Sequence, residues 1–151
     1  MVGVYERWIL PRLLDLAMRN PLLDHYRQRT IETARGLVLE VGVGSGLNLR
    51  FYSRFVDRVC EIDLSPELLR LARHRVADAL VPVSPLRASA EHLPFGDAVF
   101  DTVVMTWTLC SIANPVLALI DMRRVLKPGA RLVSLSMGCP RRRGLLVGSI
   151  G

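Results

Sequence analysis

Apolar and polar positions follow two patterns along this chain of 151 residues, one typical of strands and one typical of helices. Five short stretches are apolar without regular polar alternation, as strands of a parallel sheet covered on both faces are. They lie at 37–41, 58–62, 81–86, 100–109 and 131–135. Apolar residues at helical spacing predict helices between the strands, at 47–52, 67–79 and 115–126. This alternation predicts an α/β fold with a Rossmann-like parallel sheet of about five strands.

Two further helices are predicted in front of the sheet. The helical pattern runs from residue 5 to residue 34. Asn20-Pro21 breaks it, because proline has no amide hydrogen and cannot continue a helix. An apolar stripe on the first helix predicts packing on the core, with a lid over a binding site as the alternative. Its members are Leu10, Leu13, Leu14 and Ala17.

A glycine-rich turn after the first strand indicates a binding site. Glu40, Gly42, Gly44 and Gly46 occupy alternate positions there. Glycine lets the backbone turn sharply and approach a ligand closely, where a Cβ atom would clash. The dinucleotide fingerprint requires its third glycine at the position of Leu47. The spacing therefore predicts a nucleotide-type cofactor other than NAD, and an NAD-dependent oxidoreductase is a disfavoured alternative.

An acidic residue ends the second predicted strand. Parallel α/β sheets bind ligands outside the carboxyl ends of their strands, and Asp63 lies at such an end. A carboxylate there can accept hydrogen bonds from both hydroxyls of a ribose. The alternative is that Asp63, together with Glu67, only places negative charge at the start of the next helix. Ser65 would cap that helix and Pro66 would be its first residue.

Charge and cysteine content narrow the range of functions. The net charge is +6 and the pI about 10.0, but three arginines at 141–143 supply half of that excess, and no stripe of basic and aromatic residues occurs elsewhere. We therefore expect no nucleic-acid partner. The three cysteines, at 60, 110 and 139, have no metal-binding spacing, and we expect neither a metal nor disulfides. The apolar stretch at 8–18 is too short and too polar to span a bilayer, so a cytoplasmic protein is expected.

Three sequence blocks together resemble a known family. They are E-V-G-V-G-S-G at 40–46, A-S-A-E-H-L-P-F at 88–95 and F-D-T-V-V at 100–104. These blocks are similar to motifs of the type 11 methyltransferases, class I enzymes that use S-adenosylmethionine and include ubiquinone and menaquinone C-methyltransferases. The resemblance implies the same cofactor for this chain.

The resemblance also implies roles for particular residues. The cofactor would be held by Gly42, Gly44, Gly46 and Asp63. Ser89 and Ala90 would lie against the adenine. Glu40 would orient the glycine loop or meet the methionine ammonium, and a structural acid that bonds loop amides is the alternative.

A fourth block, T-W-T-L-C-S-I, begins at Thr106 and is similar to a signature of small-molecule methyltransferases, among them thiol-methylating enzymes. It adds Thr106 to the implied cofactor site and predicts a small-molecule acceptor. Methyl transfer mainly requires positioning of the two reactants. A general base is needed only for a protonated acceptor, and the candidates are His25, His92 and Tyr26. Cys110 is predicted to be a buried packing residue, and no catalytic residue is assigned.

The end of the chain departs from the family. Relatives continue with an acidic-histidine-glycine sequence, a helix and a final strand pair, whereas this chain reads S-M-G-C-P-R-R-R from 136 to 143. Codons for Glu-His-Gly encode Ser-Met-Gly when read one base later, so we hypothesise a frameshifted or truncated C-terminus, which the DNA would test. We expect one domain over 1–151, with N-terminal helices at 1–36, a cofactor-binding core at 37–135 and an atypical basic tail at 136–151.

The missing strand pair has two predicted consequences. The fifth strand would be left as an unpaired apolar edge, which lowers stability and favours association. A non-catalytic remnant that binds the cofactor or a partner is therefore an alternative to an active methyltransferase. The sequence predicts no particular oligomeric state.

Overall fold

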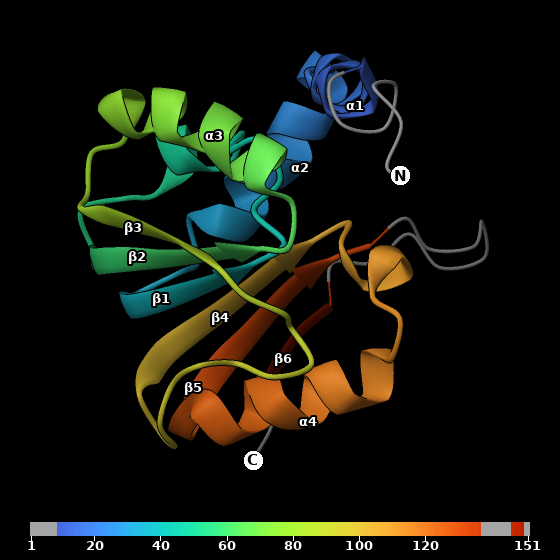
Figure 1. Ribbon diagram of the computed structural model, residues 1–151. Helices are drawn as coiled ribbons and strands as arrows, with labels where there is room; N and C mark the ends of the chain where they lie inside the picture. The colour runs from blue at the N-terminus through green and yellow to red at the C-terminus, as the bar shows by residue number, and fades with distance from the viewer. Residues whose placement is uncertain (1–8, 137–145, 150–151) are drawn as a thin grey trace.

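A single twisted sheet organises the molecule. The computed structural model describes residues 9–136 and 146–149, and its sheet has the strand order β3-β2-β1-β4-β5-β6 (Figure 1). The strands are β1 (Gly36–Val41), β2 (Val56–Asp63), β3 (Val83–Arg87), β4 (Phe100–Thr106), β5 (Leu126–Leu135) and β6 (Leu146–Ser149). Strands β1 to β5 are parallel, and β6 runs antiparallel to β5. The predicted Rossmann-like parallel sheet is confirmed.

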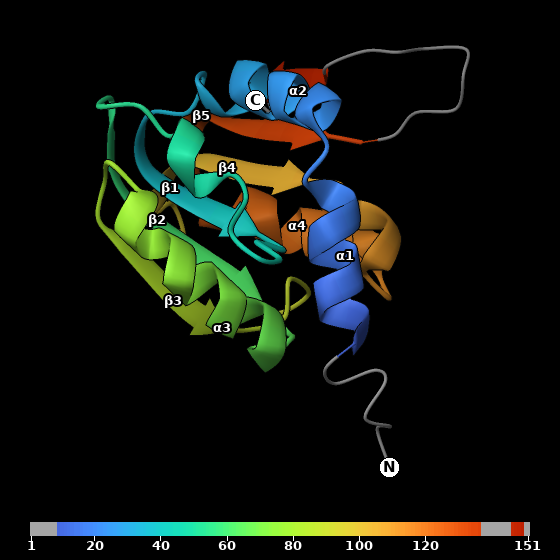
Figure 2. The ribbon, with the colours of Figure 1, turned by 90° about the horizontal axis from the view of Figure 1, so that it is seen from above.

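Helices cover both faces of this sheet. The α-helices are α1 (Leu10–Met18), α2 (Pro21–Ile31), α3 (Pro66–Arg75) and α4 (Pro115–Val125). In the described residues, three short 3₁₀ helices lie in the connections between strands and helices: η2 (Leu49–Phe51), η3 (Val76–Asp78) and η4 (Leu109–Ser111). In Figure 1, α2 and α3 lie above the sheet and α4 below it. Figure 2 shows α1 standing across the carboxyl ends of the central strands.

Three of the helices begin in the same way, with a polar cap followed by proline. In each, the cap side chain accepts a hydrogen bond from a backbone amide of the first turn, at 2.9 to 3.2 Å. The caps are Asn20, Ser65 and Asn114. These contacts confirm the predicted break at Asn20-Pro21 and the start after Ser65. The α-helical part of α3 ends at Arg75, before the predicted end, and continues only as the 3₁₀ turn η3.

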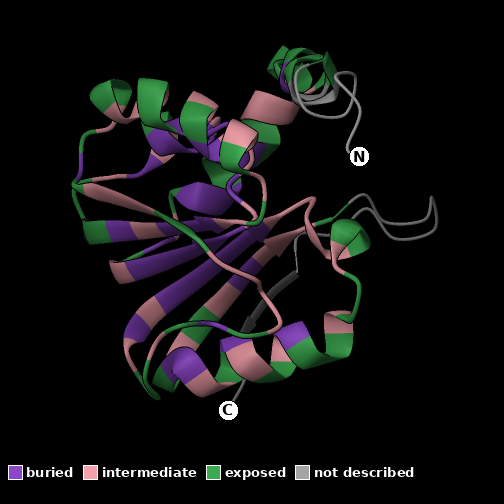
Figure 3. Cartoon of the chain, viewed as in Figure 1, coloured by how far each residue is buried: buried purple, intermediate pink, exposed green. Residues whose placement is uncertain are grey.

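The core has one layer on each face of the sheet, as expected for strands buried on both sides. Leu39, Val41 and Phe100 pack against Met122 and Val125 of α4. On the other face a second buried cluster gathers around α2, η2 and the strands, and it includes Ile31, Val38, Leu49, Tyr52 and Val59. Figure 3 shows most of β1 and β4 in the colour of buried residues, with intermediate residues near their ends.

Several predicted elements differ from the structure, and the fifth strand, predicted at 131–135, already begins at Leu126. The helix predicted at 47–52 is only the 3₁₀ turn η2, because Asn48 and Tyr52 turn their side chains inward to bind Glu40. Strand β4 ends at Thr106 and not at Leu109. At the next residue, Trp107, φ is +53°, a left-handed conformation that extended strands do not adopt.

Of the two edge strands predicted for the sheet, one is confirmed and one is wrong. Strand β3 is an edge strand, as its prolines indicated. The prediction that β5 is an unpaired edge was wrong, because β6 pairs with it through the register Arg131↔Ser149 to Ser134↔Leu146. The sequence L-V-G-S at 146–149 supplies this strand from within the tail that we had predicted to be atypical. Met137, Gly138 and the three tail arginines lie outside the described residues.

The predicted packing of the first helix on the core was wrong for two of its four stripe residues. Leu13 is 49% exposed and Ala17 is exposed as well, whereas the side chains of Leu10 and Leu14 lie outside the described part. In the described residues, no helix has the length and apolar character needed to cross a bilayer.

Candidate functional site

A cavity of about 720 Å³ lies at the carboxyl ends of β1, β2 and β4. This is where open α/β sheets bind ligands, and the volume falls within the range of about 300–1,000 Å³ typical of small-molecule sites. Six of the eight predicted site residues line it: Gly42, Gly44, Asp63, Ser89, Ala90 and Thr106. Segments distant in the sequence thus meet at one site.

The glycine loop is tied to the end of the second strand. The amides of Gly42 and Val43 both donate to the carbonyl of Ile62, at 2.9 and 3.1 Å. Gly44 has a φ of +58°, and a Cβ atom added there would meet no atom within 4 Å. The backbone at Gly44 is therefore open to the cavity and can be approached closely by a ligand.

Gly46 lies where the glycine loop packs on α3. It does not line the cavity, and its φ is +81°. A Cβ atom added there would lie 3.0 Å from the Cα atom of Ala72 in α3. Gly46 therefore allows the loop to pack closely on α3, and its part in holding a cofactor stays a prediction.

Asp63 connects the loop to the start of α3. One carboxylate oxygen accepts from the amide of Gly44 and the other from the amide of Ser65, both at 2.9 Å. Each carboxylate oxygen can accept more than one hydrogen bond, so Asp63 keeps capacity for the hydroxyl groups of a ligand in the cavity.

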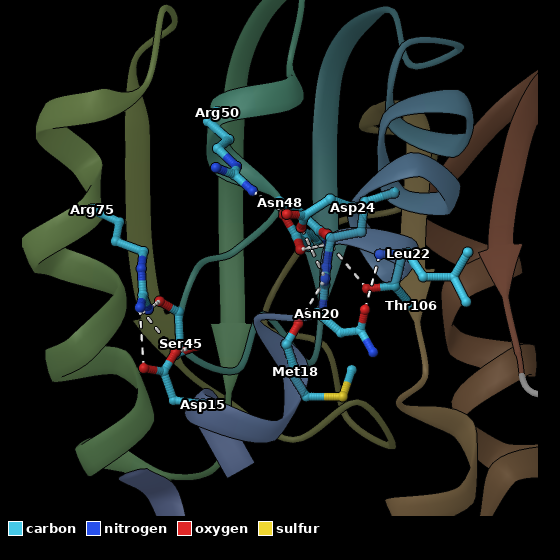
Figure 4. Close-up of polar contacts among 12 residues, drawn as sticks. Asp15, Met18, Asn20, Leu22, Asp24, Ser45, Asn48, Arg50, Arg75 and Thr106 are labelled. Carbon is cyan, nitrogen blue, oxygen red and sulfur yellow. Dashed lines mark hydrogen bonds and ion pairs between the residues drawn. The ribbon is translucent and has the colours of Figure 1, made fainter. Parts of the chain in front are cut away.

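Glu40 lies behind the cavity wall and is only 1% exposed. Its carboxylate accepts from Tyr52 Oη at 2.8 Å and from Asn48 Nδ2 at 2.6 Å. Asn48 Nδ2 also donates to Thr106 Oγ1 at 2.9 Å, as Figure 4 shows in part. Burial raises the pKa of Glu40 to about 7 against the opposing effect of these hydrogen bonds. Of the predicted roles, this geometry favours orienting the loop over contact with a cofactor ammonium.

A second acid, Glu61, is buried next to Glu40. The two residues are register partners on β2 and β1. Glu61 has no exposed surface, and its carboxylate oxygens have no hydrogen-bond partner in the part of the chain described. Burial and the nearby charges of Glu40 and Asp63 raise the pKa of Glu61 to about 8. No sequence pattern indicated this pair of acids. The pattern of residues within one strand does not show which residue of the neighbouring strand will lie beside each of them.

A buried acid of helix α1 forms hydrogen bonds with the glycine loop and with α3. Asp15 accepts hydrogen bonds from Ser45 Oγ and from Arg75 of α3, which also donates to the carbonyl of Ser45 (Figure 4). Burial raises the pKa of Asp15, but hydrogen bonds from Arg75, Ser45 and Arg19 outweigh it and hold the pKa below its usual value. Asp15 and Met18 both line the cavity, so the alternative prediction of a lid describes α1 better than core packing does.

Two further cavity residues were missed by sequence reasoning. The guanidinium carbon of Arg27 lies 4.7 Å from the centre of the Trp107 ring, and both residues line the cavity. Arg27 is 2% exposed and donates to the carbonyl of Met18 at 2.9 Å and to Asp24 at 3.3 Å. Arg27 and Trp107 come from α2 and the end of β4, and no local motif connects them.

The loop that carries Ser89 and Ala90 is held in place by α4. Asp121 accepts from the amide of Leu93 at 2.6 Å. Arg124 donates to the carbonyls of Leu93 and Phe95, at 3.1 and 2.8 Å. The hydrogen bond from Arg124 is also the main cause of the lowered pKa of Asp121. These contacts fix the position of one wall of the cavity.

The candidate bases are absent from the cavity lining. His25 and Tyr26 form an edge-to-face pair on α2, and neither they nor His92 line the cavity in the described structure. Cys110 is exposed and lines the cavity, so the prediction of a buried packing residue was wrong. The early end of β4 at Thr106 explains this, because Cys110 then falls in the surface turn η4.

Known proteins are similar to this chain over the strands and loops that form the cavity. The family model for a methyltransferase domain of type 11 matches residues 39–134. The chain belongs to the type 11 methyltransferase family. A demethylmenaquinone methyltransferase of Tropheryma whipplei is 39% identical to it over 110 residues, which are 73% of this chain and 45% of that protein. A phosphatidylethanolamine N-methyltransferase of Cereibacter sphaeroides is 37% identical over 134 residues, 85% of this chain and 64% of that protein.

A solved structure supports the methyltransferase fold. The crystal structure of an S-adenosylmethionine-dependent methyltransferase from Aquifex aeolicus matches with a TM-score of 0.66, at 24% identity. The match covers 89% of this chain and 74% of that one. The chain spans less than two thirds of the length of both curated relatives.

Proposed function

We propose that this chain binds S-adenosylmethionine in the cavity and transfers its methyl group to a small-molecule acceptor. The observation that carries the proposal is the contact between Asp63 and the amide of Gly44, which places a carboxylate beside an open glycine backbone in the cavity. The residues present fit such a cofactor, because no atom lies within 4 Å of the position that a Cβ of Gly44 would occupy.

Each wall of the cavity would hold one part of the cofactor. Asp63 would accept the ribose hydroxyls, and Ser89 and Ala90 would lie against the adenine. Arg27 would pair with the methionine carboxylate, since it is the one Lys or Arg among the described residues that line the cavity. Thr106, Gly42 and Glu40 would support the loop, Glu40 through Asn48.

The chemistry would require little from the protein beyond positioning. When bound, the cofactor supplies a methyl group on a positively charged sulfur, and the acceptor's lone pair displaces that sulfur, which keeps the electrons of the broken bond. Holding two reactants in line can contribute about 7–11 kcal/mol. The chain's own contribution would be the fixed glycine loop, the α4-braced wall and the exclusion of water by α1.

The acceptor class is proposed from the site and the relatives together. The names of the two relatives above refer to a quinone precursor and a phospholipid, and both are small molecules. We propose a small-molecule acceptor and no nucleic acid, a cytoplasmic location, and one domain divided as the sequence predicted. Neither alternative from the sequence is favoured by the family match, but a cofactor-binding chain without turnover differs from the proposal only in activity.

Calorimetric titration of S-adenosylhomocysteine into the purified chain tests the cofactor site. Asp63→Ala should weaken binding at least about tenfold, or roughly 1.4 kcal/mol, because it removes the predicted ribose contact. Asp57→Ala is the matched control, since Asp57 is an exposed acid on the same strand, and it should bind like the parent. A folded chain that binds NAD and not S-adenosylhomocysteine would contradict the proposal. Binding without methylation of any acceptor would identify the non-catalytic alternative.

A further inference from the structure

Helix α1 exposes apolar side chains that a surface helix normally hides. Ile9 at its N-cap is 45% exposed, Leu13 is 49% exposed and Leu16 is 67% exposed. Their spacing of three and four residues places them along one side of the helix. Figure 3 shows α1 at the edge of the molecule, largely in the colour of exposed residues.

The opposite side of α1 is occupied by the cavity. Asp15 and Met18 line it, and Asp15 is held by Ser45 and Arg75. A buried carboxylate bound by an arginine is costly to unpair. The helix therefore cannot rotate to bury Leu13 and Leu16 without breaking this contact, and its apolar side stays turned outward.

The charges beside this apolar stripe are basic. Arg12 is exposed, and the C-cap residue Arg19 is also exposed but pairs with the single acid of α1, Asp15, which is 6% exposed. An apolar centre bordered by arginines is the pattern of helices that lie in the plane of a membrane surface, where arginine heads remain at the lipid headgroups. The stripe thus complements an anionic lipid surface in both polarity and charge.

Other occupants fit the stripe less well. A stable dimer needs about 800 Å² from each partner and 20–30 residues a side, far more than three partly exposed side chains provide. A peptide ligand needs a groove between elements, and α1 lies as a single helix at the edge of the fold (Figure 2). A bilayer needs neither a large complementary area nor a groove.

We propose that the outward stripe of α1, formed by Ile9, Arg12, Leu13 and Leu16, docks this protein on anionic phospholipid bilayers. Docking brings the helix that covers the cavity to the lipid surface, so an amphiphilic acceptor can reach the cavity without leaving the bilayer completely. This consequence for the acceptor rests on the proposed methyltransferase function, whereas docking itself does not.

Flotation with lipid vesicles tests the proposal on the intact chain. Vesicles of phosphatidylcholine with and without phosphatidylglycerol are compared, with no cofactor present. The parent protein should bind the vesicles that contain phosphatidylglycerol, and binding should fall several-fold between 0.1 and 0.5 M salt because the arginine contribution is screened. Leu13→Ser with Leu16→Ser should lower the partition coefficient at least tenfold, and Arg12→Gln should lower it on anionic vesicles only.

The matched control is Val116→Ser with Ile120→Ser on α4. These residues are 64% and 61% exposed, similar to the stripe, but lie on the other face of the sheet (Figure 1). The control should bind vesicles within twofold of the parent. Equal losses in both variants, or no binding by the folded parent, would overturn the proposal. A parent dimer that Leu13→Ser with Leu16→Ser dissociates would make a second copy the occupant instead.

S-adenosylhomocysteine affinity, measured without vesicles, separates this inference from the proposed function. The stripe variants should keep the affinity of the parent, because the stripe faces away from the cavity. Vesicle binding without cofactor binding would refute the proposed function alone, and cofactor binding without vesicle binding would refute the docking proposal alone.

Discussion

Replacing Glu61 with leucine should stabilise this protein, and increasingly so as the pH rises. Glu61 has no exposed surface and no hydrogen-bond partner for either carboxylate oxygen among the described residues, and it faces Glu40 on the neighbouring strand. Leucine is close to glutamate in size and brings no charge into the core. Replacing buried charges by apolar residues of similar volume is often neutral or stabilising.

The size of the effect follows from the raised pKa. The pKa of Glu61 rises from an ordinary 4.5 to about 8, mainly through burial. Between these values the folded protein keeps a proton that the unfolded chain releases, so stability falls as pH rises through this window. One pKa unit corresponds to about 1.4 kcal/mol, which gives about 5 kcal/mol for the full shift. Because Glu40 titrates together with Glu61, we expect Glu61 alone to account for about 2–4 kcal/mol of this change in unfolding free energy.

Urea unfolding at several pH values between 5 and 9 measures this difference. The gain in unfolding free energy of Glu61→Leu over the parent should be small at pH 5 and should grow by about 2–4 kcal/mol toward pH 9. Glu61→Gln separates charge from polarity, since it keeps the shape and removes the titration. A gain that does not change with pH would refute the reasoning, as would a loss of stability in Glu61→Leu at pH 9.

Three further substitutions test the loop, the cavity wall and the lid. Gly46→Ala should cost about 1–3 kcal/mol in urea unfolding, because the added Cβ meets the backbone of Ala72 in α3 at 3.0 Å and φ is +81°; an unchanged midpoint would contradict this packing role. Asp121→Ala should cost about 1–3 kcal/mol and speed amide exchange in the wall at 88–95, since Leu93 loses its acceptor; unchanged exchange would count against it. Asp15→Ala should accelerate trypsin cleavage after Arg19 several-fold by releasing α1, and equal cleavage rates would show that other contacts hold this helix.

Local sequence patterns were sufficient for the strands, the helix caps and the acid at the end of β2. Although the contact of Asp63 with the amide of Gly44 joins residues nineteen positions apart, Ser65 caps α3 and Asp63 accepts from the amide of Ser65, and these short-range contacts are revealed by spacing. The same holds for Gly44, whose conformation belongs to one turn. The sequence therefore predicts the positions of these residues in the fold, and the contacts of Asp63 and Gly44 with a cofactor stay predictions.

Contacts between remote segments were not predictable in this way. Arg27 and Trp107 are separated by eighty positions, and their stacking depends on how α2 crosses the end of β4. The helix predicted at 47–52 failed because Asn48 and Tyr52 have a better partner in Glu40 than the solvent a surface helix would offer. Cys110 was misplaced for a related reason: the apolar run of β4 continues in the sequence after the backbone has already turned at Trp107.

The strand order has a consequence for the growing chain during synthesis. Strand β1 pairs with β2 on one side and with β4 on the other, and β4 ends at Thr106, 43 residues after the end of β2 at Asp63. At about 5–20 residues per second, a ribosome needs roughly 2–9 seconds to synthesise these residues. During that interval one edge of β1, with Val38, Leu39 and Val41, has no strand beside it. Nascent chains of this sequence should therefore depend on the ribosome surface or a chaperone until β4 emerges and closes the middle of the sheet.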